Sequence, residues 1–158
     1  MKTIVLVRHA KSDWPENTDD FDRPLAEKGK KDAEKMAVLL KKNGLSIDLM
    51  VSSPAIRAFD TCTIFNLAFE TEVQTNRKLY NPLEQNFSEI IYELDDRFST
   101  VAFFSHNNGI SNFANSLTEE IFHFPTCGVA GFAADCNSWA DFEVAEKRFL
   151  FFYEANLI

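Results

Sequence analysis

The sequence predicts an α/β protein in which helices cover both faces of one mixed, mostly parallel sheet. Short apolar runs without polar alternation are typical of strands that are buried on both faces, and residues 3–7 and 100–104 are runs of this kind. Segments with apolar residues at spacings of three and four lie between the runs, as expected for helices. The predicted architecture is therefore a three-layer α/β/α sandwich around one sheet.

The first strand and helix are predicted within residues 3–44. The apolar run at residues 3–7 stops abruptly at Arg8 and His9. From Pro24 onward the spacing becomes helical, and Asn43-Gly44 supplies a stop signal. The apolar residues on one face of this helix are Ala33, Met36, Ala37 and Leu40. We expect the helix to return the chain to the sheet.

A second strand is predicted at residues 48–51, with a helix directly after it. Ser52-Ser53-Pro54 offers a serine N-cap and a proline at the first helical position. Arg57 then falls in the first helical turn, where backbone N–H groups favour anions. The buried face of this helix is expected to consist of Ile56, Phe59, Thr63 and Ile64.

The second half of the chain is predicted to complete the sheet. A helix is expected at residues 87–94, a strand at 100–104 and a short helix through residues 113–117. The strand ends at the polar segment Ser105-His106-Asn107-Asn108-Gly109. Residues 129–134 and 148–153 are two further predicted strands, and the short polar turn between them indicates an antiparallel pair.

Length and charge limit the domain organisation and the partners. With 158 residues and no repeat or long linker, we expect a single domain over residues 1–158. The 24 acidic residues exceed the 16 basic ones, and the formal charge of -8 repels nucleic acid and anionic membrane surfaces. No apolar run approaches the ~20 residues of a membrane span, so a cytoplasmic protein is expected.

The cysteines and carboxylates predict no metal and no cofactor. Cys62, Cys127 and Cys136 are an odd number without C-x-x-C spacing, so we expect buried free thiols instead of a disulfide framework or a zinc site. The acidic pairs along the chain have no histidine or third carboxylate at ligand spacing.

Three predicted strands each end at a basic residue. Arg8 and His9 follow the first strand, Arg57 lies one turn into the helix after the second, and His106 follows the third. Open α/β sheets bind ligands at the C-terminal ends of their strands. Two arginines can hold the oxygens of a phosphoryl group while a neutral imidazole attacks phosphorus, and a second imidazole can donate to the developing charge. This set predicts phosphoryl-transfer chemistry.

Three segments carry a resemblance to a known family. Leu6-Val7-Arg8-His9-Ala10, Ser52-Ser53-Pro54-Ala55-Ile56-Arg57-Ala58 and Ser105-His106-Asn107 resemble, in order and spacing, the signature segments of the histidine phosphatase superfamily. Within it, the chain resembles the short bacterial phosphohistidine phosphatases of the SixA type through Lys11-Ser12-Asp13-Trp14, Asp22-Arg23-Pro24-Leu25, Gly29 and Pro125-Thr126. The resemblance implies a phosphoglycerate mutase-like fold.

The resemblance also implies a role for each site residue. His9 would be the phosphorylated nucleophile, with Arg8, Arg57 and His106 forming the phosphate pocket. Arg23 would add a cation at the rim, and Asn107 would contribute to substrate binding. Ala10, Ser105 and Asn108 depart from the glycine, glycine and proline that are common in the family, but no catalytic group is lost.

The leaving group separates the possible substrates. Larger family members place a carboxylate after a segment like Leu79-Tyr80, whereas this chain has Asn81-Pro82 there, and Asp13 and Glu84 are weak candidates for a general acid. The expected function is therefore hydrolysis of phosphohistidine on a protein. A phosphomonoesterase or mutase acting on small phosphorylated metabolites and a non-catalytic phosphate-binding module are the alternatives, and the sequence leaves the oligomeric state open.

Overall fold

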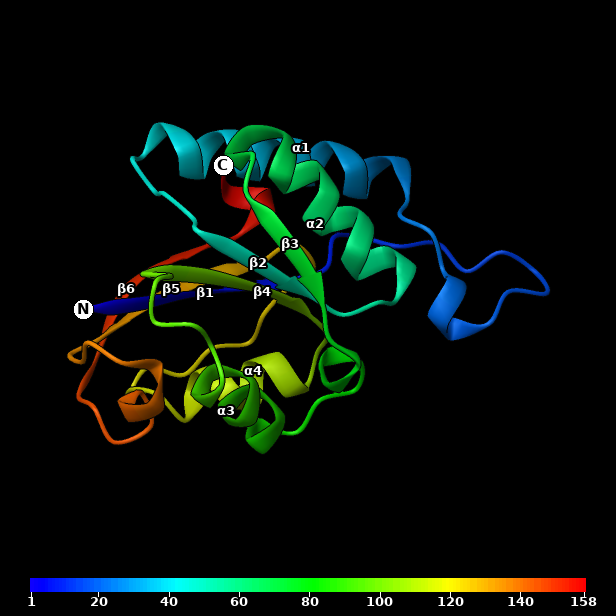
Figure 1. Ribbon diagram of the computed structural model, residues 1–158. Helices are drawn as coiled ribbons and strands as arrows, with labels where there is room; N and C mark the ends of the chain where they lie inside the picture. The colour runs from blue at the N-terminus through cyan, green and yellow to red at the C-terminus, as the bar shows by residue number, and fades with distance from the viewer.

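The structure, a computed structural model, describes residues 1–158 and contains one mixed six-stranded sheet of order β3-β2-β4-β1-β5-β6. The strands are β1 (Lys2–Arg8), β2 (Leu49–Ser52), β3 (Glu72–Thr75), β4 (Thr100–Ser105), β5 (Val129–Ala134) and β6 (Lys147–Tyr153). The helices are α1 (Glu27–Lys42), α2 (Ile56–Phe69), α3 (Glu84–Tyr92) and α4 (Gly109–Asn115). In Figure 1, α1 and α2 cover one face of the sheet and α3 and α4 the other, which confirms the predicted α/β/α sandwich.

The strand directions bring three strand ends to one edge. β1 pairs in parallel with β4, and β2 pairs in parallel with both β4 and β3, whereas β5 is antiparallel to β1 and to β6. The register places Arg8 beside Ser105 and Ser52 beside Phe104. In Figure 1 this edge lies on the right, where the segment between β1 and α1 projects from the molecule. Residues far apart in sequence therefore meet at the C-terminal edge.

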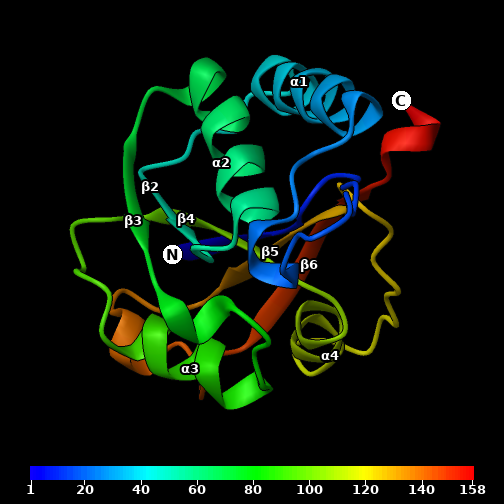
Figure 2. The ribbon, with the colours of Figure 1, turned by 90° about the vertical axis from the view of Figure 1, so that its right-hand side faces the viewer.

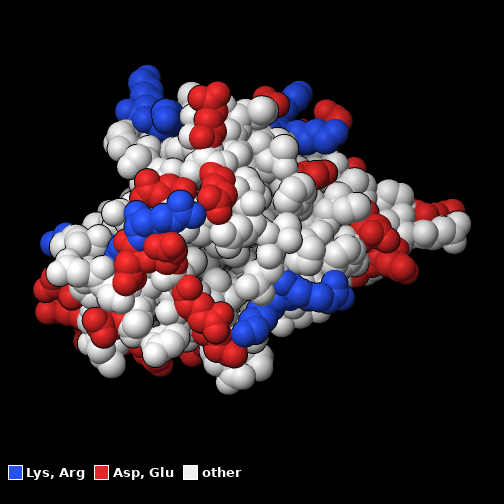
Figure 3. All heavy atoms as spheres, in the orientation of Figure 1, with Lys and Arg blue, Asp and Glu red and all other residues white.

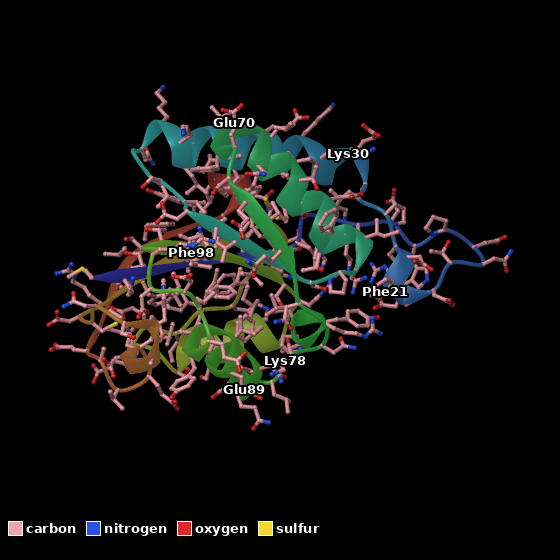
Figure 4. The ribbon with its side chains drawn as sticks, in the orientation of Figure 1. Phe21, Lys30, Glu70, Lys78, Glu89 and Phe98 are labelled. Atoms are coloured by element: carbon pink, nitrogen blue, oxygen red, sulfur yellow. The ribbon has the colours of Figure 1, made fainter.

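Two apolar cores hold the layers together because strand side chains alternate between the faces of the sheet. On β1, Ile4 and Leu6 join the core that includes Phe87 and Phe113, on the side of α3 and α4. Val5 and Val7 join the core that includes Met36, Leu40 and Phe65, on the side of α1 and α2. Figure 4 shows this dense packing of side chains above and below the sheet, and labels Phe98 of the first core on the left, just before β4. No helix combines the length and apolar composition that a membrane span requires.

The predicted strands and helices are confirmed, except that β3 was missed. Its sequence, Glu72-Val73-Gln74-Thr75, is short and polar, and only Val73 is partly buried. An edge strand of this kind lacks the apolar run by which β1 and β4 are predicted. Of the three cysteines, Cys62 and Cys127 are buried free thiols as predicted, while Cys136 is only partly buried.

The prediction for α2 was wrong in its start and in its buried face. The helix begins at Ile56, with Ala55 at the N-cap position, so Pro54 precedes the helix. Ile56 and Phe59 are each more than one-third exposed. The buried residues are instead Arg57, Ala58, Thr61, Cys62, Phe65 and Phe69. The pattern misled because two polar residues, Arg57 and Thr61, share the buried face and hydrogen-bond within the protein.

Candidate active site

A polar cavity of about 400 Å³ lies at the C-terminal edge of the sheet. Figure 2 views the ribbon from that edge, and the segment after β1 crosses in front of the strand ends. Every residue of its lining is polar or charged: Arg8, His9, Lys11, Ser12, Asp20, Arg23, Arg57, Asn81, His106, Asn107 and Thr126. The cavity is lined by three arginines and by one carboxylate, that of Asp20. It is therefore locally cationic although the chain carries a formal charge of -8.

All six residues predicted for the site lie on this cavity. Arg8 ends β1 and His9 follows it, while Arg57 comes from the first turn of α2 and His106 from the end of β4. The His9 and His106 rings are neighbours, with centroids 5.2 Å apart. Arg23 and Asn107, the remaining two predicted residues, also line the cavity. The geometry thus assembles residues that are separated by up to about 100 positions in the sequence.

The ring of His9 is fixed by a hydrogen bond on one side only. Nδ1 lies 2.8 Å from the carbonyl oxygen of Ala10, so Nδ1 carries the proton and donates it. Nε2 has no hydrogen-bond partner in the protein and, because His9 lines the cavity, is free to meet a ligand. The Ala10 N–H donates in turn to Oγ1 of Thr61, 3.0 Å away. Two successive main-chain contacts therefore hold the orientation of the imidazole.

Burial keeps His9 neutral. The residue is only 6 % exposed, and burial, together with the nearby charges of Arg57, Arg8 and Arg23, lowers the pKa of His9 to about 4. A neutral imidazole with a fixed Nδ1–H presents the lone pair of Nε2, which is the form required for attack on phosphorus.

Arg8 and Arg57 are held by oxygen atoms of the protein. Nη1 of Arg8 donates to the carbonyl oxygen of Phe124 at 2.9 Å. Nη1 and Nη2 of Arg57 donate to the carbonyl oxygen and the Oδ2 of Asp20, at 2.5 and 3.1 Å. The Nε atoms of both arginines are buried and have no partner. Each guanidinium group therefore has N–H groups without an acceptor in the protein. Because an unpaired buried donor is costly, an anion that accepts from these groups would be bound favourably.

His106 is neutral in this pocket. Its Nε2 lies 2.8 Å from Oγ of Ser53, and its Nδ1 is buried without a partner. Burial is the main cause that lowers the pKa of His106 to about 3, and the neighbouring His9 contributes. The expected donation from a cationic His106 therefore requires an anion in the cavity, because a nearby negative charge favours the protonated ring.

Arg23 and Asn107 are tied into the rim of the cavity. Arg23 donates to Oγ of Ser12 at 2.9 Å and to Oδ1 of Asp20 at 3.3 Å, and its guanidinium lies 4.5 Å from the centre of the exposed Trp14 ring. Oδ1 of Asn107 accepts a hydrogen bond from Ser111 at 2.5 Å. Both side chains are oriented by the protein before any ligand binds.

The departures from the family motifs leave the pocket intact. Ala10 is fully buried in the core beside α1 and α2. The hydroxyl of Ser105 donates to the carbonyl oxygen of Leu79 at 2.7 Å, so it is satisfied inside the protein. Asn108 lies at the N-cap position of α4 without a side-chain capping bond.

Asp20, Tyr80 and Ser53, which hydrogen-bond to predicted site residues, were missed from the sequence. Four further residues of the lining were not predicted as site residues either: Lys11, Ser12, Asn81 and Thr126. Asp20 accepts hydrogen bonds from Arg57, Arg23 and Tyr80. It lies three residues before Arg23, but nothing in that acidic segment distinguishes it from Asp19 or Asp22. The two carboxylates considered as general acids are elsewhere, since Asp13 does not line the cavity and Glu84 lines a separate hollow beside α3.

The family model of the histidine phosphatase superfamily (branch 1) matches residues 4–100. The chain therefore belongs to the histidine phosphatase superfamily, as the three motif segments predict. Within it, the chain is similar to the structure of the proposed phosphohistidine phosphatase SixA from Agrobacterium tumefaciens. The two share 25 % sequence identity with a TM-score of 0.84, over 97 % of each chain.

Two further solved structures share the fold. The protein histidine phosphatase SixA in complex with tungstate has a TM-score of 0.85 at 20 % identity, over 99 % of each chain. A mycobacterial glucosyl-3-phosphoglycerate phosphatase in complex with VO3 has a TM-score of 0.76 at 16 % identity, over 94 % of this chain and 97 % of the other. These similarities establish the fold, which proteins named for different substrates share.

Proposed function

We propose that the protein is a phosphatase that takes the phosphoryl group of its substrate onto His9, and that its preferred substrate is phosphohistidine on a protein. The observation that carries the proposal is the state of His9. Its ring is neutral, its Nδ1–H is committed to Ala10, and its free Nε2 belongs to a cavity that is also lined by Arg8, Arg57 and Arg23.

The reaction balances in two steps. In the first, Nε2 of His9 attacks phosphorus, the bond from phosphorus to the leaving nitrogen breaks, and that nitrogen takes a proton from water, which becomes hydroxide. In the second, hydroxide attacks the phosphorus of phosphorylated His9, the bond from phosphorus to Nε2 breaks, and inorganic phosphate and the neutral ring, with its Nδ1–H, are released. Arg8 and Arg57 would hold the equatorial oxygens throughout, because guanidinium groups match phosphoryl oxygens in charge and geometry. Asn107 and Arg23 would complete substrate binding at the rim.

The absence of a protonated carboxylic acid in the cavity favours a nitrogen leaving group. The only carboxylate of the lining is Asp20, and its pKa is about 2 because of its hydrogen bonds with Tyr80 and Arg57. It is ionised at neutral pH and has no proton to give. Transfer from one imidazole to another is nearly balanced, whereas an alkoxide needs a general acid that typically contributes ~10²–10⁴-fold. The similarity to a SixA structure at 25 % identity supports the same substrate class.

The test is a comparison of kcat/KM for three substrates: a phosphohistidine-bearing phosphotransfer domain, a simple sugar phosphate and an aryl phosphate. We expect the phosphohistidine protein to be hydrolysed fastest, the aryl phosphate slowly and the sugar phosphate slowest. His9→Ala is the control for contaminating phosphatases. Faster hydrolysis of the sugar phosphate would assign the protein to the metabolite phosphatases, and binding without any turnover would assign it to the non-catalytic class.

A further inference from the structure

Asp20 is the one carboxylate that the projecting segment between β1 and α1 contributes to the cavity, beside Lys11, Ser12 and Arg23 of the same segment. It begins the short 3-10 turn η1 (Asp20–Asp22), and Figure 4 labels the adjacent Phe21 at the base of that segment. The side chain is 36 % exposed, whereas that of Arg57 is only 6 % exposed. The ring of Phe21 packs edge-on against Tyr80, with centroids 5.2 Å apart, which supports the turn from the other side.

The contacts of Asp20 converge on the cationic groups of the cavity. Its main-chain oxygen and Oδ2 accept from the two terminal nitrogens of Arg57, and Oδ1 accepts from Arg23. Oδ2 also accepts from the hydroxyl of Tyr80 at 2.6 Å. Every hydrogen bond that the Arg57 guanidinium makes within the protein goes to Asp20. The orientation of Arg57 therefore depends on this one residue.

The same contacts leave Arg57 able to bind a ligand. A guanidinium carries five N–H bonds, and Asp20 engages one on each terminal nitrogen. One N–H remains on each of those nitrogens, and the Nε–H is also unpaired. The cavity of about 400 Å³ is present with Asp20 in place, so a phosphoryl group does not need to displace the carboxylate. Asp20 and a bound anion can share Arg57.

Charge gives the second reason for a carboxylate at this position. Arg8, Arg23 and Arg57 line one cavity and repel one another, and Asp20 is the only acidic residue of the lining. Figure 3 shows that acidic side chains also lie along the projecting segment, but these are on its outer surface. Without the Asp20 side chain, the buried guanidinium of Arg57 would lose its counter-charge and the acceptor Oδ2, and would keep only the main-chain oxygen of residue 20 as an acceptor.

We propose that Asp20 is a positioning residue that holds Arg57, and with it Arg23, in the orientation that receives the phosphoryl group. This inference rests on the proposed function, because it assigns a role within the same cavity. The opposite possibility is that Asp20 competes with the substrate: the Asp20 carboxylate would occupy Arg57 until a phosphoryl group displaces it. The two possibilities predict changes of opposite sign when the carboxylate is removed.

The experiment combines kinetics with a direct view of Arg57 in the full chain. The variants are Asp20→Ala, Asp20→Asn, Arg57→Ala and the double variant Asp20→Ala/Arg57→Ala. The matched control is Asp22→Asn, which removes an exposed carboxylate from the same turn. We would measure kcat and KM for p-nitrophenyl phosphate, and record the arginine Nε–H resonances by NMR, with Arg57 assigned from Arg57→Lys.

If Asp20 positions Arg57, kcat/KM should fall by different amounts in the Asp20 variants, and the fall should require Arg57. Asp20→Ala should lower kcat/KM by ~10-fold or more, mainly in kcat, and Asp20→Asn by less because it keeps one acceptor oxygen. Asp22→Asn should stay within ~2-fold of the wild type. In the Arg57→Ala background, Asp20→Ala should cost little further, since contacting residues that act through one another are not additive. The Nε–H resonance of Arg57 should broaden or shift in Asp20→Ala alone.

Three kinetic results would overturn the inference. The first is an unchanged kcat/KM in Asp20→Ala, and the second is that Asp20→Ala lowers kcat/KM as much in the Arg57→Ala background as in the wild type. The third is a higher kcat/KM in Asp20→Ala, which would identify Asp20 as a competitor of the substrate for Arg57. Failure of the proposed function can be distinguished from failure of this inference. If the wild type does not hydrolyse p-nitrophenyl phosphate, or if His9→Ala remains active, the nucleophile assignment fails. The Arg57 resonance then decides the inference by itself: an unaltered signal in Asp20→Ala refutes positioning and a broadened or shifted signal supports it.

Discussion

The rings of His9 and His106 lie with their centroids 5.2 Å apart at an interplanar angle of 52°, both buried at the same edge of the sheet. Two imidazolium ions could not share this space with three arginines, and burial accordingly lowers the pKa of both rings. The neutral pair provides one ring with a free Nε2, the proposed nucleophile, and one ring with an unpaired buried Nδ1. The chemistry of the cavity therefore begins from uncharged histidines.

Titration of the two rings tests this starting state. Because their pKa values are lowered from 6.5 to about 4 for His9 and about 3 for His106, both rings should stay neutral as the pH falls from 7 to 5. We expect the NMR ring resonances, assigned with His9→Gln and His106→Gln, to show midpoints near these values. A midpoint at or above 6.5 for His9 in the ligand-free protein would contradict the neutral nucleophile.

The same shifts predict how stability depends on pH. In the unfolded chain both histidines bind protons as the pH falls through 6.5, whereas in the folded chain they bind them only near 4 and 3. The unfolded state then binds more protons, so the contribution of these histidines to the free energy of unfolding decreases as the pH falls below 6.5. Urea unfolding at pH 7 and at pH 5 would measure this decrease in the free energy of unfolding. The decrease should be smaller in His9→Gln/His106→Gln than in the wild type, and equal decreases would contradict the prediction.

Removal of Arg57 should impair catalysis strongly. Arg57→Ala takes a buried charge-assisted donor from the phosphoryl group, which should cost ~2–5 kcal/mol of transition-state stabilisation, or ~30- to ~5,000-fold in kcat/KM. Arg57→Lys keeps the charge but loses the planar fork and should recover only part of this loss. Arg97→Ala is the matched control, because Arg97 is an exposed arginine outside the cavity. A loss in Arg57→Ala no larger than that in Arg97→Ala would exclude Arg57 from the site.

The sequence alone was sufficient to predict those strands, helices and site residues that local residue patterns mark. The apolar runs of β1 and β4 predict buried parallel strands, and this topology predicts that Arg8, His9, Arg57 and His106 meet at one edge. Asp20 could not be found in this way. It contacts Arg57 and Tyr80 across 37 and 60 positions of sequence, so only the folded chain shows which of several aspartates faces the cavity.

The prediction of the buried face of α2 was wrong for a related reason. Apolar periodicity assumes that polar residues point to solvent, and on this helix Arg57 and Thr61 point inward because the cavity and Ala10 provide their partners. Functional side chains therefore shift the apparent phase of a helix. The missed β3 is a different case, since its pairing with β2 is made by the backbone, and its exposed side chains carry little of the signal.

Gly29 should be intolerant of a side chain although it lies within α1. Its ideal Cβ would lie 2.1 Å from the carbonyl oxygen of Lys11, in the segment that follows His9. Alanine gains about 1 kcal/mol of helix propensity over glycine, but this steric overlap should outweigh the gain. We expect a net loss of ~1–3 kcal/mol in the free energy of unfolding for Gly29→Ala by urea denaturation. Lys31→Ala, on the exposed face of α1, should be nearly neutral, and an unchanged Gly29→Ala would show that the helix can move away from Lys11.

Activity should not depend on a metal ion. No group of three or more histidine, cysteine or acidic side chains lies close enough together to hold one, and the arginines of the cavity can provide the charge neutralisation that divalent ions give in two-metal phosphatases. Assays in excess EDTA should match untreated enzyme, and added magnesium, manganese or zinc should not raise the rate. A large loss in EDTA that one ion restores would show that the arginines are not sufficient.

The most direct test of the central claim is to trap the phosphorylated enzyme. Rapid quenching during turnover of a phosphohistidine protein or an aryl phosphate, followed by mass spectrometry under alkaline conditions, locates the transferred group. We predict an acid-labile phosphate on His9, and no label and no turnover in a folded His9→Ala protein, because Nε2 of His9 is unpaired in the cavity and is the proposed nucleophile. A phosphate on any other residue, or a His9→Ala protein that keeps most of its activity, would contradict the mechanism.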